Sequence, residues 1–198
     1  LEYCNSIDGT SDADHSIDIN TTVPITITNM SHFARLSTDR IVNVAKNASL
    51  TLDNCLVCGR EYDDGSITDN ASVGAAYVAG TLSLNNSQIR YFSAENGGGV
   101  YIANGGSLTL SSSTIEYCSA DNGGGVYVAT GGNIEIDNYS SISNNSANDN
   151  GGGVYFATVD GNNRITISGI TENSANYGGG VYVAGGTLTI SNAVYIYN

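Results

Sequence analysis

Apolar and polar residues alternate along the chain in short stretches that follow one another closely. GVYIA (99–103), SLTLS (107–111) and TIEYC (114–118) all show this period of two. Such a period predicts β-strands, because successive side chains of a strand point to opposite faces. We expect Val100, Ile102, Leu108, Leu110 and Ile115 to point inward, and Tyr101 and Thr109 to point outward. No segment has the apolar spacing of a helix.

The alternating stretches belong to a repeat. A tyrosine occupies the same place in each unit, at positions 77, 101, 127, 155 and 182, so that the spacings are 24, 26, 28 and 27 residues. Repeats of this length, with three short strands per unit and no helix, are typical of stacked coils. The sequence therefore predicts an all-β fold, a single-stranded parallel β-helix with about 24–28 residues per coil.

Glycine triplets precede the first strand of four units, at 97–99, 123–125, 151–153 and 178–180. Glycine accepts positive φ and lets another backbone approach closely. We expect the triplets to form a narrow corner, where neighbouring coils lie about 4.8 Å apart and a side chain would clash.

We interpret residues 1–198 as one β-helix domain. Residues 1–40 form degraded first coils with a polar loop, and 41–198 form regular coils interrupted by an insertion loop near 58–69. Both ends of the sequence stop at the same phase of a coil, and neither resembles a cap. Because an open coil exposes strand edges, we expect end-to-end stacking into a fibre, with a cap formed by residues 5–15 as the alternative.

Two successive units carry a known repeat. They resemble the F-x-x-N and G-G-A-I repeats of chlamydial polymorphic outer-membrane proteins, with Ile in place of Phe and Gly in place of Ala. The matching residues are Ile142, Asn145, Ala147, Gly151, Gly152, Gly153, Val154 and Tyr155, and Ile170, Asn173, Ala175, Gly178, Gly179, Gly180, Val181 and Tyr182. The resemblance covers about residues 70–198. It implies a right-handed β-helix displayed at the cell surface, often as an adhesin.

Composition narrows the choice of partners. The 6 Lys and Arg and 19 Asp and Glu give a formal net charge of −13, which disfavours nucleic acid and anionic membranes. No run of about 18 apolar residues is present, so membrane insertion is not expected. We expect an extracellular or cell-surface structural protein, adhesin-like and not an enzyme, whose partners are other copies of itself or a cell-surface protein or glycan.

Two outward columns are candidate surfaces. The tyrosine column comprises Tyr77, Tyr101, Tyr127, Tyr155 and Tyr182. Aromatic rings bind sugars or proteins, or they stack on one another and stabilise the coil. The first use leads to the alternative function, a carbohydrate-binding or polysaccharide-processing β-helix. The second column resembles the hydroxyl ladder of ice-binding solenoids, a minor alternative, although Glu135 interrupts it; its members are Thr51, Ser83, Thr109, Glu135, Thr166 and Thr189.

Groups for catalysis and metal binding are scattered. Glu116, Glu135 and Glu172 fall on different faces, and the denser acidic segments lie in expected loops around 8–18 and 61–64. The two histidines, His15 and His32, stand alone in polar segments. Clustering of such groups is what catalysis and metal coordination require. We therefore assign no catalytic residue, no cofactor and no metal site.

Cysteines and sequons complete the candidates. The C-x-x-C of Cys55 and Cys58 lacks the context of a redox or zinc motif. Cys4 and Cys118 share a repeat position with Phe92, and Cys58 falls within a residue of it, which favours small core residues. A bridge between Cys58 and Cys118 is not expected, because the Phe92 coil separates them. Glycosylation candidates are Asn20, Asn29, Asn47, Asn70, Asn85, Asn138 and Asn144. Asn145 and Asn173 are expected to form an internal amide ladder.

Overall fold

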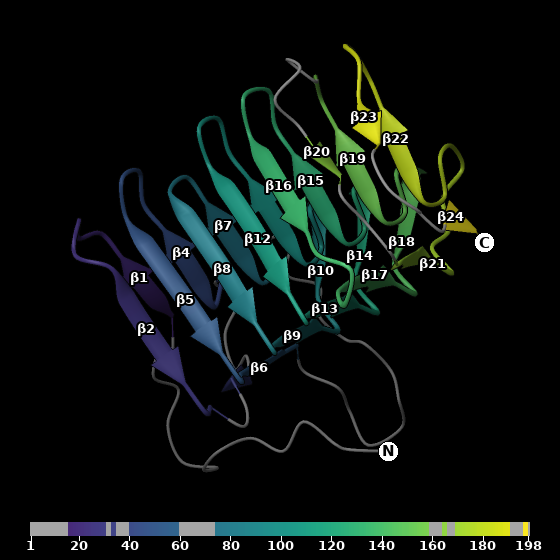
Figure 1. Cartoon of the computed structure of the whole chain (residues 1–198). Coiled ribbons are helices and arrows are strands. Elements are labelled where there is room, and N and C mark those ends of the chain that lie inside the picture. Colours follow the sequence, from purple (N-terminus) through teal and green to yellow (C-terminus); the bar gives the residue numbers. More distant parts are fainter. Residues whose placement is uncertain are drawn as a thin grey trace.

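The computed structural model describes residues 16–30, 33–34, 40–59, 74–158, 164–165, 169–190 and 196–197. All described elements are strands, and every pair of them runs parallel. Consecutive coils stack along one axis, from the purple strands of the N-terminal side to the yellow strands of the C-terminal side (Figure 1). The predicted all-β parallel β-helix is therefore confirmed.

Sheet 1 carries the tyrosine column and contains one strand from each coil. Its order is β1 (Ile17–Ile19), β4 (Val42–Val44), β7 (Ala76–Val78), β11 (Val100–Ile102), β15 (Val126–Val128), β19 (Val154–Phe156) and β22 (Val181–Val183). The register places Asn43 against Tyr77 and Tyr77 against Tyr101, as the repeat predicts.

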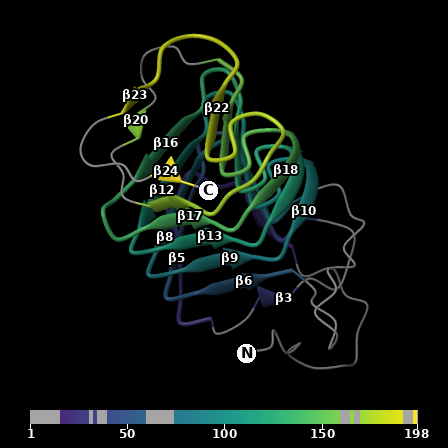
Figure 2. The same ribbon diagram turned by 90° about the vertical axis from the view of Figure 1, so that its right-hand side faces the viewer.

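Sheets 2 and 3 form the other two long faces. Sheet 2 comprises β2 (Ile25–Thr28), β5 (Ser49–Asp53), β8 (Thr81–Asn85), β12 (Ser107–Ser111) and β16 (Asn133–Ile136), and β20 (Arg164–Ile165) pairs separately with β23 (Thr189–Ile190). Sheet 3 comprises β3 (Phe33–Ala34), β6 (Leu56–Cys58), β9 (Gln88–Arg90), β13 (Thr114–Glu116), β17 (Ser141–Ser143), β21 (Gly169–Thr171) and β24 (Ile196–Tyr197). The end view shows strands of sheet 3 stacked in coil order (Figure 2).

A fourth, short sheet adds to the three strands per coil that the sequence predicts. It consists of β10 (Ser93–Asn96), β14 (Ser119–Asn122) and β18 (Ser146–Asn150). Its sequences SAEN, SADN and SANDN are polar and lack the apolar alternation from which strands are recognised. Inter-coil backbone hydrogen bonds, together with the Asn96–Asn122–Asn150 side-chain ladder, hold these strands together.

The core lies between the sheets and is filled by the inward residues of every coil. Val100, Ile102, Leu108, Leu110 and Ile115 are all 0% exposed, whereas Tyr101 and Thr109 on the same strands are half-buried and face outward. This confirms the predicted alternation. Phe92 and Phe156 are the largest fully buried side chains.

The glycine triplets form the corner before sheet 1. Gly151 has φ = 64°, in the left-handed region that favours glycine. At Gly152 the reason is space, because a Cβ would collide with the carbonyl oxygens of Ser174 and Gly179 in the next coil. Both expected roles of the triplet, positive φ and close backbone approach, are confirmed.

Candidate functional site

The tyrosine column is a continuous stack of rings on the outer face of sheet 1. Successive ring centroids lie 5.5, 5.0, 4.8 and 5.5 Å apart from Tyr77 to Tyr182, with interplanar angles between 7° and 14°. In-register parallel strands bring identical side chains to this spacing, which matches that of adjacent strands. The first ring is covered on its other side by Arg40, whose guanidinium carbon lies 5.0 Å from the Tyr77 centroid.

Face-to-face stacking limits what the tyrosine column can bind. Each inner ring turns both of its faces to neighbouring rings, so the edges and hydroxyl groups are what faces solvent. A sugar that stacks on an aromatic residue needs an open ring face. Burial raises the pKa of Tyr127, with the neighbouring Tyr155 and Tyr101 acting in the same direction. The arrangement suits coil stabilisation and a ridge of hydroxyl groups better than a sugar platform.

A second aromatic pair lies at the corner that follows sheet 3. Tyr91 and Tyr117 stack with centroids 5.2 Å apart, although both adopt left-handed backbone conformations. The Arg90 guanidinium lies 5.5 Å from the Tyr91 centroid. Next to it, desolvation raises the pKa of Glu116, and the charge of Arg90 opposes this shift. Sequence analysis did not identify this pair, although IRYFSA and IEYCSA place both tyrosines at one repeat position.

The hydroxyl column is in register only through part of sheet 2. Thr51, Ser83, Thr109 and Glu135 oppose one another on adjacent strands. Thr189 pairs with Arg164 in the structure. Thr189 therefore does not align with Thr166, which lies outside the described residues. The expected alignment of Thr166 with Thr189 is therefore wrong by two residues, and the column does not extend regularly toward the C-terminal side.

The sequons differ in exposure. Asn20, Asn29, Asn47 and Asn138 are exposed, Asn85 and Asn144 are half-buried, and Asn70 lies outside the described residues. Asn29 also accepts a hydrogen bond from Asn54 at 2.8 Å, at one end of a surface amide ladder that continues to Asn86. The hydroxyl of Ser87, in the Asn85 sequon, is buried and bonded to backbone carbonyls.

Internal polar ladders line two of the corners. Asn145 accepts a hydrogen bond from Cys118 N–H at 2.9 Å, and its own N–H donates to the side chain of Asn173 at 2.9 Å. The amide groups of both asparagines also donate to backbone carbonyls, so these buried polar side chains are satisfied. The predicted internal amide ladder is confirmed. A parallel ladder of Ser87, Ser113 and Ser140 lies between sheets 2 and 3.

The cysteines do not share one role. Cys118 is buried and reduced, and burial raises the pKa of its thiol to about 12, so its expected role as a small core residue is confirmed. Cys55 is also buried and reduced. Cys58 takes part in a disulfide whose partner lies outside the described residues. Cys58 is fully buried, as expected of a core residue, but it is bonded in a disulfide and lies opposite Arg90, two residues before the Phe92 position and not within one. The reduced state of Cys118 agrees with the absence of a Cys58–Cys118 bridge.

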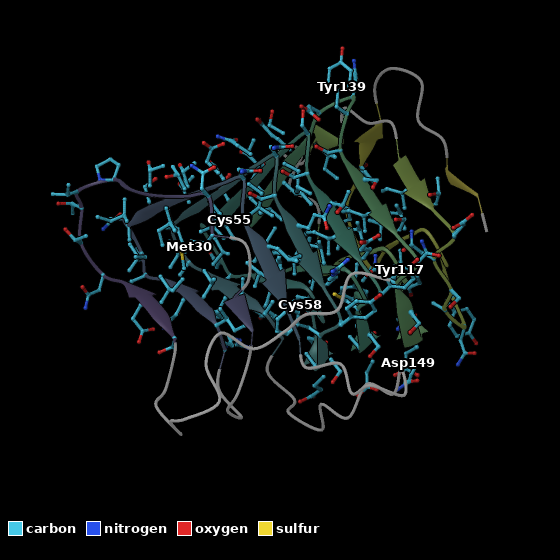
Figure 3. All side chains as sticks on the ribbon, turned by 90° about the horizontal axis from the view of Figure 1, so that it is seen from below. Met30, Cys55, Cys58, Tyr117, Tyr139 and Asp149 are labelled. Atoms are coloured by element: carbon cyan, nitrogen blue, oxygen red, sulfur yellow. The ribbon has the colours of Figure 1, made fainter. Side chains whose placement is uncertain are left out.

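One corner departs from the repeat, and the sequence analysis did not single it out. Two residues separate Leu110 from Ser113 between sheets 2 and 3, but three separate Ile136 from Ser140 in the next coil. The extra residue places Tyr139 on the outside with 82% of its surface exposed. Figure 3 shows Tyr139 projecting from the edge of the molecule. The 28-residue spacing between Tyr127 and Tyr155 contains this extra residue and a second one in β18, so the spacing signals an insertion without locating it.

The Asp137 carboxylate organises this corner. It accepts hydrogen bonds from the Ser140 hydroxyl at 2.7 Å and from Tyr139 N–H at 3.0 Å within its own coil. It also accepts from the Ser111 hydroxyl at 3.0 Å and from Ser112 N–H in the preceding coil. Partial desolvation acts to raise the pKa of Asp137, but these hydrogen bonds outweigh it and lower the pKa below its usual 3.8.

A groove runs beside the corner on the outer face of sheet 2. It has a volume of about 400 Å³ and is lined by Thr109, Leu110, Ser111, Glu135, Ile136, Asp137, Asn138 and Tyr139. Leu110 and Ile136 point into the core, so their backbone forms the floor. The outward side chains of the other residues form the walls.

The other candidate groups for catalysis or metal binding do not form a cluster among the described residues. They contain no group of three or more His, Cys, Asp and Glu placed to hold a metal ion. Within the same ranges, no helix has the length and apolarity needed to cross a membrane. His15, His32 and the acidic segment 61–64 lie outside the described residues. Glu116 and Glu135 lie on sheets 3 and 2, and Glu172 follows β21.

Comparison with known proteins does not assign the chain to a family. No family model matches the chain, and neither the curated proteins nor the solved structures include a match.

Proposed function

We propose that the protein is a non-enzymatic structural protein of the cell surface or extracellular space, an adhesin-like β-solenoid whose activity is to present a long, regular surface. The tyrosine stack is the observation that carries the proposal. Five tyrosine rings from successive coils stack face to face, with neighbouring ring centroids 4.8–5.5 Å apart. Such a ladder stiffens a scaffold and covers both faces of its inner rings, Tyr101, Tyr127 and Tyr155.

The remaining surface agrees with a scaffold role. Outward positions repeat from coil to coil, so hydroxyl, amide and carboxylate groups are displayed at the spacing of adjacent strands. The net charge of −13 disfavours nucleic acid and anionic membranes, so the proposed partners are another copy of the chain, a cell-surface protein or a glycan. The resemblance to polymorphic outer-membrane-protein repeats supports display at the cell surface.

Localisation in the source cells tests the proposal. Antibodies raised against the folded 198-residue chain are applied to intact cells and, separately, to permeabilised cells, with an antibody to an internal protein as the control. We expect intact cells, or the medium around them, to be labelled. Labelling that appears only after permeabilisation contradicts the proposal.

A test for enzymatic activity is independent of localisation. The purified chain is incubated with a panel of neutral and acidic polysaccharides, and the release of reducing ends is followed. We expect no turnover above the buffer control. Turnover that disappears on Glu135→Gln or Asp137→Asn would favour the polysaccharide-processing alternative, because paired carboxylates are the usual catalytic groups of glycoside hydrolysis.

A further inference from the structure

We infer that the groove beside Tyr139 is a binding site for a neutral sugar residue. The groove lies at a corner where the outer surface departs from the repeat. Three features coincide there: the extra residue in the corner, the replacement of a hydroxyl-bearing residue by Glu135, and the 82% exposure of Tyr139. These features do not contribute to regular coil stacking, because the inserted residue interrupts the corner that the neighbouring coils share.

Tyr139 differs from the stacked tyrosines in what it offers to solvent. The rings of Tyr101, Tyr127 and Tyr155 are covered on both faces by neighbouring rings. The ring of Tyr139 takes part in no aromatic contact with the described residues and lies at the rim of a groove. An aromatic ring with a polar tip at the rim of a groove suits the C–H face of a pyranose.

Polar groups beside the ring suit sugar hydroxyls. Glu135 is exposed on β16, directly opposite Thr109 on β12, and both line the groove. The carboxylate accepts hydrogen bonds, and the threonine hydroxyl both donates and accepts. A volume of about 400 Å³ is enough for a small ligand. The carboxylate and the net charge of −13 disfavour uronic and sialic acids, so the ligand class is a neutral hexopyranose.

The corner is held in place before any ligand arrives. Asp137 fixes the backbone of Tyr139 and Ser112 through its hydrogen bonds and ties two coils together. A preorganised site loses less conformational entropy on binding than a mobile one. Asp137 is therefore a positioning residue, and Tyr139 and Glu135 are the residues that contact the ligand.

The site does not depend on the proposed scaffold function. A scaffold without a sugar site would still label intact cells, and a sugar site would still bind its ligand in a protein of another location. Failure of one test therefore leaves the other unaffected.

Titration followed by ¹H–¹⁵N NMR tests the site. The probes are methyl β-D-glucopyranoside, methyl α-D-mannopyranoside, methyl β-D-galactopyranoside and N-acetylglucosamine. The full chain is produced in a bacterial host that adds no N-glycan, so that no sugar on Asn138 competes. We expect at least one probe to bind with Kd of about 1 mM, as is usual for a small ligand with few contacts, and to shift amide resonances of residues 109–111 and 135–140.

Matched variants separate the groove from other tyrosines. Tyr139→Ala and Glu135→Ala should each weaken binding about tenfold, the loss expected for one aromatic contact or one charge-assisted hydrogen bond. Tyr177→Ala removes another highly exposed tyrosine, 68% exposed, and Tyr127→Ala removes a stacked ring; both should bind as the unmodified chain does. The strand signal in circular dichroism checks that each variant is folded.

Three results would overturn the inference. The first is that none of the four probes shifts these resonances at about 50 mM, well above the expected Kd. The second is that the shifts centre on the tyrosine column and vanish with Tyr127→Ala. The third is that folded Tyr139→Ala and Glu135→Ala variants bind as tightly as the unmodified chain.

Discussion

Glycines in the corners on either side of sheet 1 depend on their neighbours to different degrees, as Gly105, between β11 and β12, and Gly152, before β19, show. Gly105 has φ = 78° and no other atoms near the position of a Cβ, so only its backbone conformation favours glycine. Gly152 sits directly under the backbone of the next coil. The two positions therefore separate the cost of backbone conformation from the cost of coil spacing.

We expect Gly152→Ala to destabilise the fold by about 3 kcal/mol or more, because the carbonyls of Ser174 and Gly179 have to move apart. Gly105→Ala should cost about 1 kcal/mol, the penalty of a left-handed non-glycine residue. Urea unfolding of both variants measures the difference. Equal losses would show that coil spacing is not what the triplet protects.

Asp137 shows how one carboxylate couples stability to pH. Its folded-state pKa lies below the ordinary 3.8, so the ionised form stabilises the fold above that pH. As the pH falls from about 4 through the folded pKa, this stabilisation is lost. Asp137→Asn should cost about 1–2 kcal/mol at neutral pH and progressively less under acid conditions, because the unmodified protein then loses the same contribution.

Chemical unfolding at a series of pH values measures this effect. Asp149→Asn is the control, because Asp149 is exposed on β18 and its side chain makes no hydrogen bond to the described residues (Figure 3). It should be nearly neutral throughout. An Asp137→Asn effect that does not change between pH 7 and pH 3 would contradict the hydrogen-bond account.

Elements are joined by columns that cross the strands. In sheet 1, Tyr127 stacks on two rings, whereas Tyr182 stacks on one described ring. Stacked aromatic pairs contribute about 0.5–1.5 kcal/mol beyond area burial. The stack is thus a ladder of nearly equal contributions between adjacent strands.

Tyr127→Ala should lower the free energy of unfolding by about 1–3 kcal/mol, because two stacking contacts are lost. Tyr182→Ala, which removes one such contact among the described residues, should cost about half as much. Tyr139→Ala, which removes an exposed ring, should change the free energy of unfolding by less than about 0.5 kcal/mol. Denaturant midpoints with a constant m-value test the order. A loss from Tyr139→Ala as large as that from Tyr127→Ala would contradict it.

The corner after sheet 3 gives a second inter-coil column, formed by Phe92, Cys118, Asn145 and Asn173. Cys118→Asn should be neutral or stabilising, because the new amide can accept from Phe92 N–H as Asn145 accepts from Cys118 N–H. Asn145→Cys should cost about 1–3 kcal/mol, because it removes the acceptor for Cys118 N–H and the donor to Ile115 O. Thermal unfolding compares the two, and the ladder interpretation fails if Cys118→Asn costs as much as Asn145→Cys.

At the scale of the whole molecule, the strands of the described residues pair with those of the adjacent coils. Among the described residues the amide ladder ends at Asn173, and β22 is the last strand of sheet 1. Strand edges of a parallel β-helix can pair with a further strand. We propose that copies of the chain associate end to end through such pairing.

The proposed end-to-end assembly predicts that association increases with protein concentration. Sedimentation velocity over a range of concentrations, with negative-stain microscopy of the same samples, should show species that grow along one axis. Association should become stronger as the salt concentration rises, because the charge of −13 on each copy opposes association until salt screens it. A monodisperse monomer at high concentration and high salt excludes assembly and leaves a single displayed module.

Much of the architecture was available from local pattern and period. The inward positions, the marker tyrosines and the glycine corner were all predicted and confirmed, because each depends on alternation within a strand and on a repeat of fixed phase. The polar strands β10, β14 and β18 were missed, since their pairing rests on backbone and asparagine hydrogen bonds between coils. The register of Thr189 was also predicted incorrectly, because β23 pairs with β20 two residues away from the alignment that the repeat suggested.

The repeat alone specifies which residues meet in a column, because the same residue returns at the same phase of each coil. How these residues meet depends on the three-dimensional packing of the coils. Ring orientation turned the tyrosine column into a closed stack, and Cys58 is bonded in a disulfide that its repeat position did not predict. One extra residue between Ile136 and Ser140 became an exposed tyrosine beside a groove. These outcomes depend on distances and angles between coils, which a one-dimensional period does not contain.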